Sequence, residues 1–163
     1  MNSDAEKKPL LLSLALVHWP IYDRMKNIIC TNVTNFDVHD IARVSTAYNL
    51  QNYFIVNRMK EQLMFVSRLL DHWRLGSGSK YNPMRKTALS RVVPVEYLKD
   101  AIAAIDPKPF VVATSAREIE GVPRMSFRDL RVRLETESQP TLLVFGTGFG
   151  LAPEVFEECD ALL

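Results

Sequence analysis

The sequence predicts an α/β fold in which a mainly parallel sheet is covered by helices on both faces. Short apolar runs of strand length alternate with amphipathic runs of helix length along almost the whole chain, which is the pattern of successive β-α units. The first apolar run, Leu10–Val17, has the length and composition of a buried strand. The 163 residues, 47% of them hydrophobic, suit one domain with a real core.

The strands follow from apolar runs that end at turn-forming residues. Leu10–Val17 is bounded by His18-Trp19-Pro20. Four later apolar runs complete the expected set of strands, which are Tyr53–Val56, Val92–Val93, Phe110–Thr114 and Thr141–Phe145. The final residues, Ala161 to Leu163, resemble the start of another strand, and a parallel edge strand without its covering helix exposes apolar surface. We therefore expect the native protein to continue beyond them.

The helices follow from apolar side chains at helical spacing and from capping residues. Ile41, Val44 and Ala47 predict a first helix over Val38–Tyr48, with Asn35 or Asp37 as its N-cap. The others expected are Lys60–Trp73, Val95–Ile105, Ser126–Glu135, which Ser126 can cap, and Pro153–Glu158. Two stretches, Pro20–Asn35 and Trp73–Arg91, depart from the alternation.

Composition narrows the class of protein. Net charge is +1 and the chain has two cysteines, which form neither a disulfide framework nor a metal-ligand cluster, so no metal site is expected. The longest apolar run, Leu10–Val17, is much shorter than the roughly 20 residues that span a bilayer. Residues 1–9 are polar and indicate a flexible tail and not a signal peptide, which leaves residues 10–163 as a single domain. We expect a cytoplasmic protein.

Three alternate glycines directly follow the last complete strand. The segment runs Phe145-Gly146-Thr147-Gly148-Phe149-Gly150-Leu151, and glycines there permit positive φ and close approach of backbone amides to a ligand. The spacing G-x-G-x-G and the late position both differ from the dinucleotide fingerprint. Binding of an adenosine-containing ligand is favoured, and a tight turn that needs glycine for geometry alone stays open.

Two further segments are candidates for binding RNA. Asn35 lies at the entry to the first helix with Arg43 two turns later, where an arginine can hold a phosphate or a base; a cap and a surface charge are the simpler alternative. Trp73–Arg91 contains five basic residues and no acidic one, with aromatic residues among them. Such a mobile loop suits phosphate neutralisation and base stacking, although a solvated loop without a partner stays open.

Five ordered segments together resemble a small bacterial family of SPOUT (α/β-knot) RNA methyltransferases. They are Ala15–Pro20, Thr34–Arg43, Gly78–Pro83, Thr114–Ala116 and Phe145–Leu151. The resemblance implies a sheet whose C-terminal part forms a trefoil knot, and a homodimer through the knot face. In the family the chain continues with a further cofactor loop and a final knot helix, so the knot is expected to be incomplete in this chain.

The resemblance also implies roles for individual residues. S-adenosylmethionine would be held by Thr114, Ser115, Gly146, Thr147, Gly148, Phe149, Gly150 and Leu151. Asn35 and Arg43 would serve catalysis. Apart from the resemblance, the basic and aromatic residues of Trp73–Arg91 predict that the RNA, a tRNA or an rRNA, would be bound by Arg74, Lys80, Tyr81, Asn82, Arg85 and Lys86.

The expected function is methyl transfer from S-adenosylmethionine to an RNA nucleotide. No general base is evident in the sequence, and an arginine is a poor one. The alternatives are a non-catalytic RNA-binding or S-adenosylmethionine-sensing module on the same fold, because a fold does not establish activity, and, more remotely, a nucleotide-dependent oxidoreductase.

Overall fold

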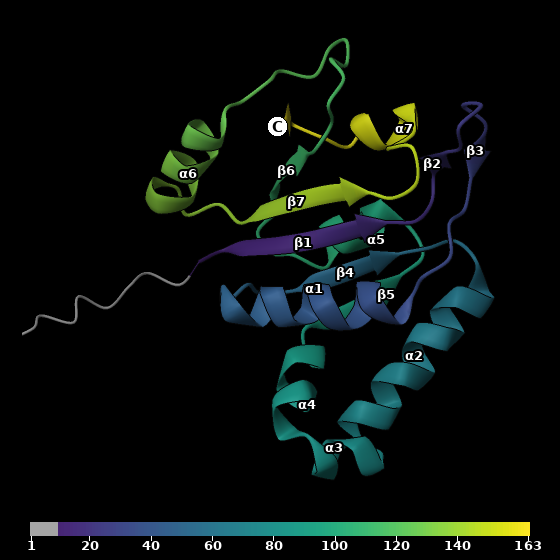
Figure 1. The fold of residues 1–163 in the computed structure, drawn as a ribbon. Coiled ribbons are helices and arrows are strands. Elements are labelled where there is room, and N and C mark those ends of the chain that lie inside the picture. The colour runs from purple at the N-terminus through teal and green to yellow at the C-terminus, as the bar shows by residue number, and fades with distance from the viewer. Residues whose placement is uncertain (1–9) are drawn as a thin grey trace, which may run out of the picture.

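The computed structural model describes residues 10–163, which form a parallel sheet of six strands with helices on both faces (Figure 1). The strands are β1 (Leu12–Val17), β4 (Tyr53–Val56), β5 (Val92–Val95), β6 (Phe110–Ala113), β7 (Thr141–Gly146) and β8 (Ala161–Leu162). Their order is β5-β4-β1-β7-β6-β8, and every neighbouring pair is parallel. The predicted fold class is confirmed, including the strand at Ala161. The predicted tail, residues 1–9, lies outside the described residues.

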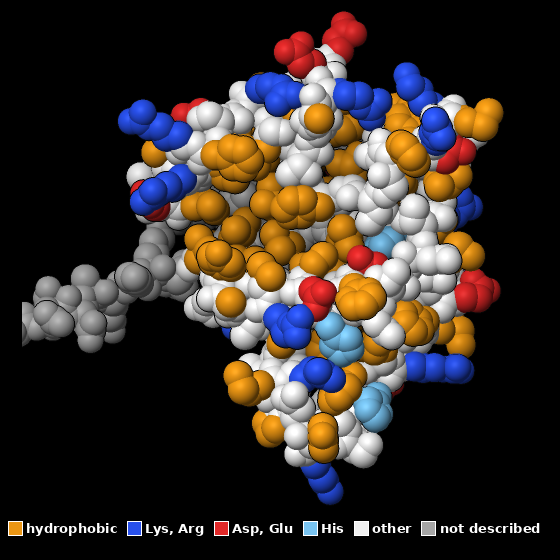
Figure 2. Space-filling view, viewed as in Figure 1, with side chains coloured by type: hydrophobic (Ala, Val, Ile, Leu, Met, Phe, Trp, Pro, Cys, Tyr) orange, Lys and Arg blue, Asp and Glu red, His pale blue; other side chains and the backbone are white. Residues whose placement is uncertain are grey.

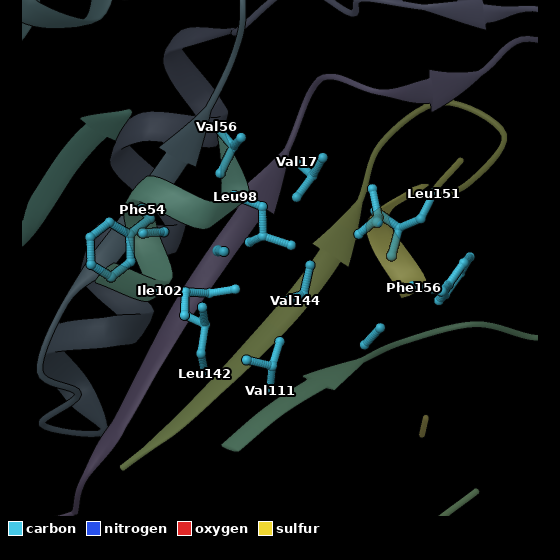
Figure 3. Packing of buried hydrophobic residues seen from close by; sticks show 14 of the residues in the cluster. Val17, Phe54, Val56, Leu98, Ile102, Val111, Leu142, Val144, Leu151 and Phe156 are labelled. Atoms are coloured by element: carbon cyan, nitrogen blue, oxygen red, sulfur yellow. The ribbon is translucent and has the colours of Figure 1, made fainter. Parts of the chain in front are cut away.

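The helices divide between the two faces because alternate residues of each strand point to opposite sides. Those outside the stretch after Trp73 are α1 (Asn35–Ala47), α2 (Lys60–Arg74), α5 (Leu98–Ala103), α6 (Phe127–Thr136) and α7 (Pro153–Phe156). Ala15 and Val17 of β1 pack with α5 and α7 in one cluster of buried side chains (Figure 3). Leu14 and Leu16 of the same strand pack with α1 and α2 in another.

A strip of the sheet between α1 and α6 has no helix over it. Figure 1 shows β1 and β7 crossing this strip, and Figure 2 shows hydrophobic side chains gathered over it. A shallow apolar cavity of ≈ 370 Å³ lies there, lined by Leu14, Leu16, Ile41, Val44, Tyr53, Phe145 and Gly146. Val44 and Phe145 keep 50% and 37% of their surface exposed. The strip is therefore an open apolar surface.

The stretch between β1 and α1 forms a hairpin that the sequence pattern does not predict. Its strands, β2 (Ile21–Tyr22) and β3 (Ile28–Ile29), pair antiparallel. The Asp23 carboxylate closes the turn by accepting hydrogen bonds from the backbone N–H groups of Met25 and Asn27, both at 2.8 Å. Strands of two residues are too short to give an alternating pattern.

The basic stretch after Trp73 is helical, so its prediction as a mobile loop is wrong. It contains α3 (Ser77–Tyr81) and α4 (Pro83–Leu89). The Asn82 side chain caps α4 by accepting a hydrogen bond from the N–H of Arg85 at 3.0 Å, and Pro83 occupies the first turn. Asparagine followed by proline is a helix-start signal that the glycines and serines of this stretch obscure.

The start of α1 also differs from the prediction, because Thr34 is its N-cap and not Asn35 or Asp37. The Thr34 hydroxyl accepts from the N–H of Asp37 at 3.2 Å, and the Asp37 carboxylate accepts from the N–H of Thr34 at 2.7 Å. Together these bonds form a capping box. Asn35 is thus left exposed in the first turn with its side chain free of the capping role.

The glycine loop after β7 is clamped to the β2–β3 hairpin. The N–H of Phe149 donates to the carbonyl of Tyr22 at 3.0 Å, and the N–H of Tyr22 donates to the carbonyl of Gly150 at 2.9 Å. Gly148 has φ 55°, and a Cβ there would lie 3.0 Å from Ile21 Cγ2 and 3.2 Å from the Tyr22 carbonyl oxygen. Gly148 is therefore required both for its backbone angle and for the closeness of the hairpin.

Alanine at Gly148 should destabilise the protein more than alanine at Gly121, which also has positive φ but would place its Cβ with nothing within 4 Å. Gly121→Ala should lower the free energy of unfolding by about 1 kcal/mol, the cost of the left-handed angle. Gly148→Ala should lower it by about 2–4 kcal/mol, because crowding adds to that cost. Urea unfolding followed by circular dichroism measures both, and equal losses would show that the hairpin clamp contributes nothing.

Candidate functional site

The parallel sheet brings the two segments predicted to bind a cofactor to the rim of one cavity. Its volume is ≈ 640 Å³, and it lies where β6 and β7 end at the same edge of the sheet. All eight predicted residues line it, which are Thr114, Ser115, Gly146, Thr147, Gly148, Phe149, Gly150 and Leu151. The two segments are about thirty positions apart in the sequence, and the Thr114 hydroxyl donates to the carbonyl of Val144 at 3.1 Å. The backbone of β7 thus fixes one segment beside the other.

Arg117 and Phe127 also line this cavity, and neither was predicted from the sequence. Among the described residues of the lining, Arg117 alone has a charged side chain. Its guanidinium carbon stands 5.6 Å from the centre of the Tyr22 ring, on the hairpin that clamps the glycine loop. Phe127 is the first residue of α6 and is 79% exposed, which is unusual for a large apolar side chain. A cation and an exposed aromatic ring at the rim of a cavity are binding groups, and their nearness to Thr114–Ser115 and to the Ser126 cap was the available signal.

The cavity therefore offers three kinds of binding group. Glycine backbone lets a ligand approach closely, the threonine and serine hydroxyls can exchange hydrogen bonds with it, and Arg117 can meet an anionic group. A volume of ≈ 640 Å³ lies within the usual range of small-molecule sites. An adenosine-containing ligand with a carboxylate matches these groups in size and chemistry.

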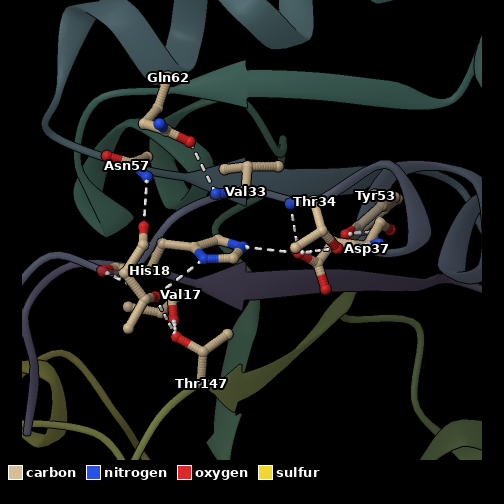
Figure 4. A network of polar contacts seen from close by, with 10 residues as sticks. Val17, His18, Val33, Thr34, Asp37, Tyr53, Asn57, Gln62 and Thr147 are labelled. Carbon is tan, nitrogen blue, oxygen red and sulfur yellow. Dashed lines mark hydrogen bonds and ion pairs between the residues drawn. The ribbon is translucent and has the colours of Figure 1, made fainter. Parts of the chain in front are cut away.

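Directly behind the glycine loop, a chain of polar contacts leads from Thr147 to the start of α1 (Figure 4). The hydroxyl oxygens of Thr147 and Thr31 are 2.6 Å apart. Thr31 Oγ1 is 3.0 Å from Nδ1 of His18, and Nε2 of His18 is 3.9 Å from a carboxylate oxygen of Asp37. The chain links the loop that lines the cavity with the helix that carries Asn35.

His18 is almost completely buried, with 1% of its surface exposed. Burial lowers the pKa of its imidazole, and the nearby Asp37 carboxylate opposes this effect only in part. The ring is therefore neutral at pH 7, and one of its nitrogens accepts a hydrogen bond while the other carries the proton.

The two residues predicted to be catalytic lie on α1, at different distances from the cavity edge of the sheet. Asn35 is exposed in the first turn, one residue after Thr34. Arg43 is exposed two turns later and pairs with Asp40 on the same helix. Eight residues of helix advance by about 12 Å, so the two side chains do not meet at one point. Their catalytic role stays a prediction.

The six residues predicted to contact RNA are spread over α2, α3 and α4, and two of them make structural hydrogen bonds. Arg74 donates to the carbonyl oxygens of Leu89 and Val92, both at 2.5 Å, and Asn82 caps α4. Lys80, Tyr81 and Lys86 are exposed.

The sixth, Arg85, places its guanidinium carbon 4.3 Å from the centre of the Trp73 ring. The exposed cations and the Tyr81 ring, 88% exposed, form the part of this set that is open to a partner.

Within residues 10–163, no group of three or more His, Cys, Asp or Glu side chains could hold a metal ion. In the same range, no helix is long and apolar enough to cross a membrane.

Comparison with known proteins identifies a family and a fold. The model of a family described as SAM-dependent RNA methyltransferases matches residues 11–163. A tRNA (guanine-N(1)-)-methyltransferase of Nitratidesulfovibrio vulgaris is 43% identical over 93% of this chain and 36% of its own length. An uncharacterized protein of Aquifex aeolicus is 32% identical over 92% of this chain and 74% of its own length.

A solved structure has the same arrangement of elements. It is a probable methylase family protein from Haemophilus influenzae Rd KW20, which aligns with a TM-score of 0.60 over 96% of this chain and 55% of that chain, at 16% sequence identity. This likeness confirms the fold. The chain spans little more than a third of the tRNA methyltransferase that it matches, so the activity named for that protein belongs to a much longer chain.

Proposed function

Because the chain belongs to the family of SAM-dependent RNA methyltransferases, we propose that it transfers a methyl group from S-adenosylmethionine to an RNA nucleotide. The observation that carries the proposal is the single cavity at the ends of β6 and β7, which unites Thr114–Ser115 with Gly146–Leu151. S-adenosylmethionine supplies a methyl group already activated on a sulfonium. When an RNA nucleophile attacks the methyl carbon, the bond from that carbon to sulfur breaks and the cofactor leaves as the thioether, S-adenosylhomocysteine. The protein then has mainly to align the two.

Different residues of the cavity would bind different parts of the cofactor. The backbone of Gly146–Leu151 would hold the adenosine end, since glycine permits the closest approach. Thr114 and Ser115 would face it from the end of β6. Arg117 would pair with the carboxylate of the methionine end, as the cation among the described lining residues.

RNA would approach over the exposed start of α1 and the cationic surface of α3 and α4. The Asn35 carboxamide can both donate to and accept from a base edge. Lys80, Arg85 and Lys86 can neutralise phosphates, and Tyr81 can stack on an unpaired base. Arg74 would support this surface from within, because its guanidinium holds the backbone carbonyls that end α4 and begin β5. Such a substrate would be met in the cytoplasm.

The first RNA to test is tRNA, because the relative from Nitratidesulfovibrio vulgaris is named a tRNA (guanine-N(1)-)-methyltransferase. A second candidate function rests on the same comparison. This chain corresponds to 36% of that protein, so its counterpart there could bind RNA while another part of the chain performs the reaction. A non-catalytic RNA-binding module is therefore the alternative to an enzyme.

We propose that a second copy of the chain covers the apolar strip between α1 and α6. The strip is lined almost wholly by apolar side chains, and Gly146 belongs both to it and to the wall of the cavity. A symmetric dimer buries the same patch on both copies. A dimer here would place the second subunit directly beside the bound cofactor and would bring its own α1 toward the site.

Transfer of labelled methyl groups tests the activity. The full-length protein should label tRNA or total RNA purified from a strain that lacks its gene, and Asn35→Ala should lower the rate at least about tenfold if it orients the acceptor. Glu61→Ala, an exposed change in the first turn of α2, is the matched control for folding. Binding of this RNA without any label would support the non-catalytic module and overturn the enzyme.

Replacement of Arg117 tests how the cofactor is held. S-adenosylhomocysteine and 5′-methylthioadenosine share the nucleoside, but only the first has a carboxylate. Arg117→Gln should weaken the first roughly 3- to 10-fold, the effect of one charge-assisted bond, and leave the second unchanged in calorimetric titration. Arg131→Gln, on α6 and paired with Glu135, is the matched control. Equal effects on the two ligands would assign Arg117 to another partner.

The dimer can be broken by one charge. Val44→Asp should convert a dimer into a monomer in light scattering after size exclusion, because it buries an unpaired carboxylate in the strip. Leu75→Asp changes an apolar side chain that is 82% exposed at the end of α2, and it should leave the mass unchanged. A wild-type protein that is monomeric at micromolar concentration contradicts the proposal.

A further inference from the structure

His18 is buried, yet one of its two ring nitrogens has no hydrogen-bond partner among the described residues. Its ring is 1% exposed and lies between the glycine loop and the start of α1 (Figure 4). Nδ1 has a partner in Thr31, but Nε2 has no hydrogen-bond partner within the described part of the chain. A buried ring nitrogen without a hydrogen bond is costly. The Asp37 carboxylate lies beside this nitrogen, at 3.9 Å.

The hydroxyl groups next to His18 allow two arrangements of donors and acceptors, or proton orders, along the series His18–Thr31–Thr147. If Nδ1 carries the proton, it donates to Thr31, which donates to Thr147, which in turn donates to the carbonyl of Val17 at 3.1 Å. If Nε2 carries it, Nδ1 accepts from Thr31. The single proton of Thr31 is then used, so the 2.6 Å contact between the two hydroxyl oxygens requires Thr147 to donate to Thr31.

The charge of Asp37 selects between the two orders. A neutral Nε2 without a proton would present a lone pair to a carboxylate oxygen, and the two would repel each other. An Nε2–H instead points its positive end toward that oxygen. The Asp37 carboxylate is held in place by the backbone N–H and the hydroxyl of Thr34, at 2.7 and 2.8 Å. The second order, with the proton on Nε2, is therefore favoured, and in it Thr147 donates to Thr31 in place of the carbonyl of Val17.

We propose that His18 is a positioning residue of the cofactor cavity, which carries its proton on Nε2 and holds Thr147 of the glycine loop in place through Thr31. This inference rests on the proposed binding of S-adenosylmethionine. The arrangement follows the logic of a carboxylate that fixes the tautomer of a histidine, which then orients a hydroxyl group. Because Thr147 lines the cavity, loss of the hydrogen bonds that link His18, Thr31 and Thr147 would let the cavity wall that faces the ligand move.

The backbone of Thr31 is also held by hydrogen bonds, so the residue that joins His18 to Thr147 is itself fixed in place. The carbonyl of Thr31 accepts from the Asn57 side chain at 3.1 Å, and the N–H of Thr31 donates to the carbonyl of His18 at 2.8 Å. Asn57 is fully buried at the end of β4. The carboxyl ends of β1, β4 and β7 thus meet in this group of side chains, which connects them more rigidly than the loops alone.

Calorimetric titration with S-adenosylhomocysteine tests the proposal in the full-length protein. Thr31→Val and His18→Leu should each weaken binding roughly 3- to 10-fold, the effect of one hydrogen bond. His18→Asn should restore binding to within about twofold of wild type, because its amide oxygen can take the place of Nδ1 as the acceptor for Thr31. Thr141→Val is the matched control, since it removes a buried hydroxyl at the opposite end of β7 that has no partner in the described chain.

The outcomes separate this inference from the function on which it rests. A wild-type protein that does not bind S-adenosylhomocysteine overturns the proposed function. A wild-type protein that binds it, with Thr31→Val binding equally well, overturns the positioning role while the function stands. If His18→Leu fails to fold, Thr31→Val alone decides. A His18→Asn that binds no better than His18→Leu also contradicts the proposal.

The tautomer provides a readout that does not depend on any ligand. Nitrogen-15 spectra of the imidazole should show the proton of His18 on Nε2 in the wild type at pH 7. Asp37→Asn should shift the population toward Nδ1–H, because the charge that selects the tautomer is gone. A proton found on Nδ1 in the wild type would reverse the proposed order and overturn it.

Discussion

β1 and β7 pair in parallel along their whole length, from Leu12 beside Thr141 to Val17 beside Gly146. This pairing joins two parts of the chain that lie 129 positions apart in the sequence, as Leu12 and Thr141 do. Everything at the functional edge of the sheet depends on it, because the residues after β1 and after β7 then emerge side by side. The hairpin clamps the glycine loop, and His18 reaches Thr147 through Thr31, only while this register holds. A slip by one residue would turn Gly146 and its neighbours to the opposite face.

The same central position of β1 and β7 explains why the site lies beside an open apolar surface. Helices α1 and α6 pack at either side of the two strands and leave the strip between them bare (Figures 1 and 2). Gly146, at the end of β7, borders the strip and the cavity alike. Oligomerisation and ligand binding are thus coupled by geometry in the proposed dimer, since a partner on the strip would rest against the wall of the cavity.

Charged side chains serve two separate purposes in this fold. Arg74 has a structural role, because its guanidinium donates hydrogen bonds to the carbonyls of Leu89 and Val92. Arg117 makes a contact with the Tyr22 ring but leaves its guanidinium available at the cavity. Only an arginine of the second kind can recognise a ligand without breaking the fold. The difference lies in whether backbone acceptors stand within reach, which depends on how α4 and β5 pack against α2.

The sequence by itself determined the fold class, the strands of the six-stranded sheet and five of the helices, because these depend mainly on periods of two and 3.6 residues that neighbouring side chains express. It also predicted the glycine loop, and the family resemblance added Thr114 and Ser115 as its partners. Tertiary structure alone decided that Arg117 and Phe127 join the cavity, that α3 and α4 replace a loop, and that His18 is buried between two segments. These features depend on contacts between residues far apart in the chain, or on elements too short to show a period, so a local pattern indicates them only weakly, as Asn82-Pro83 does for the start of α4.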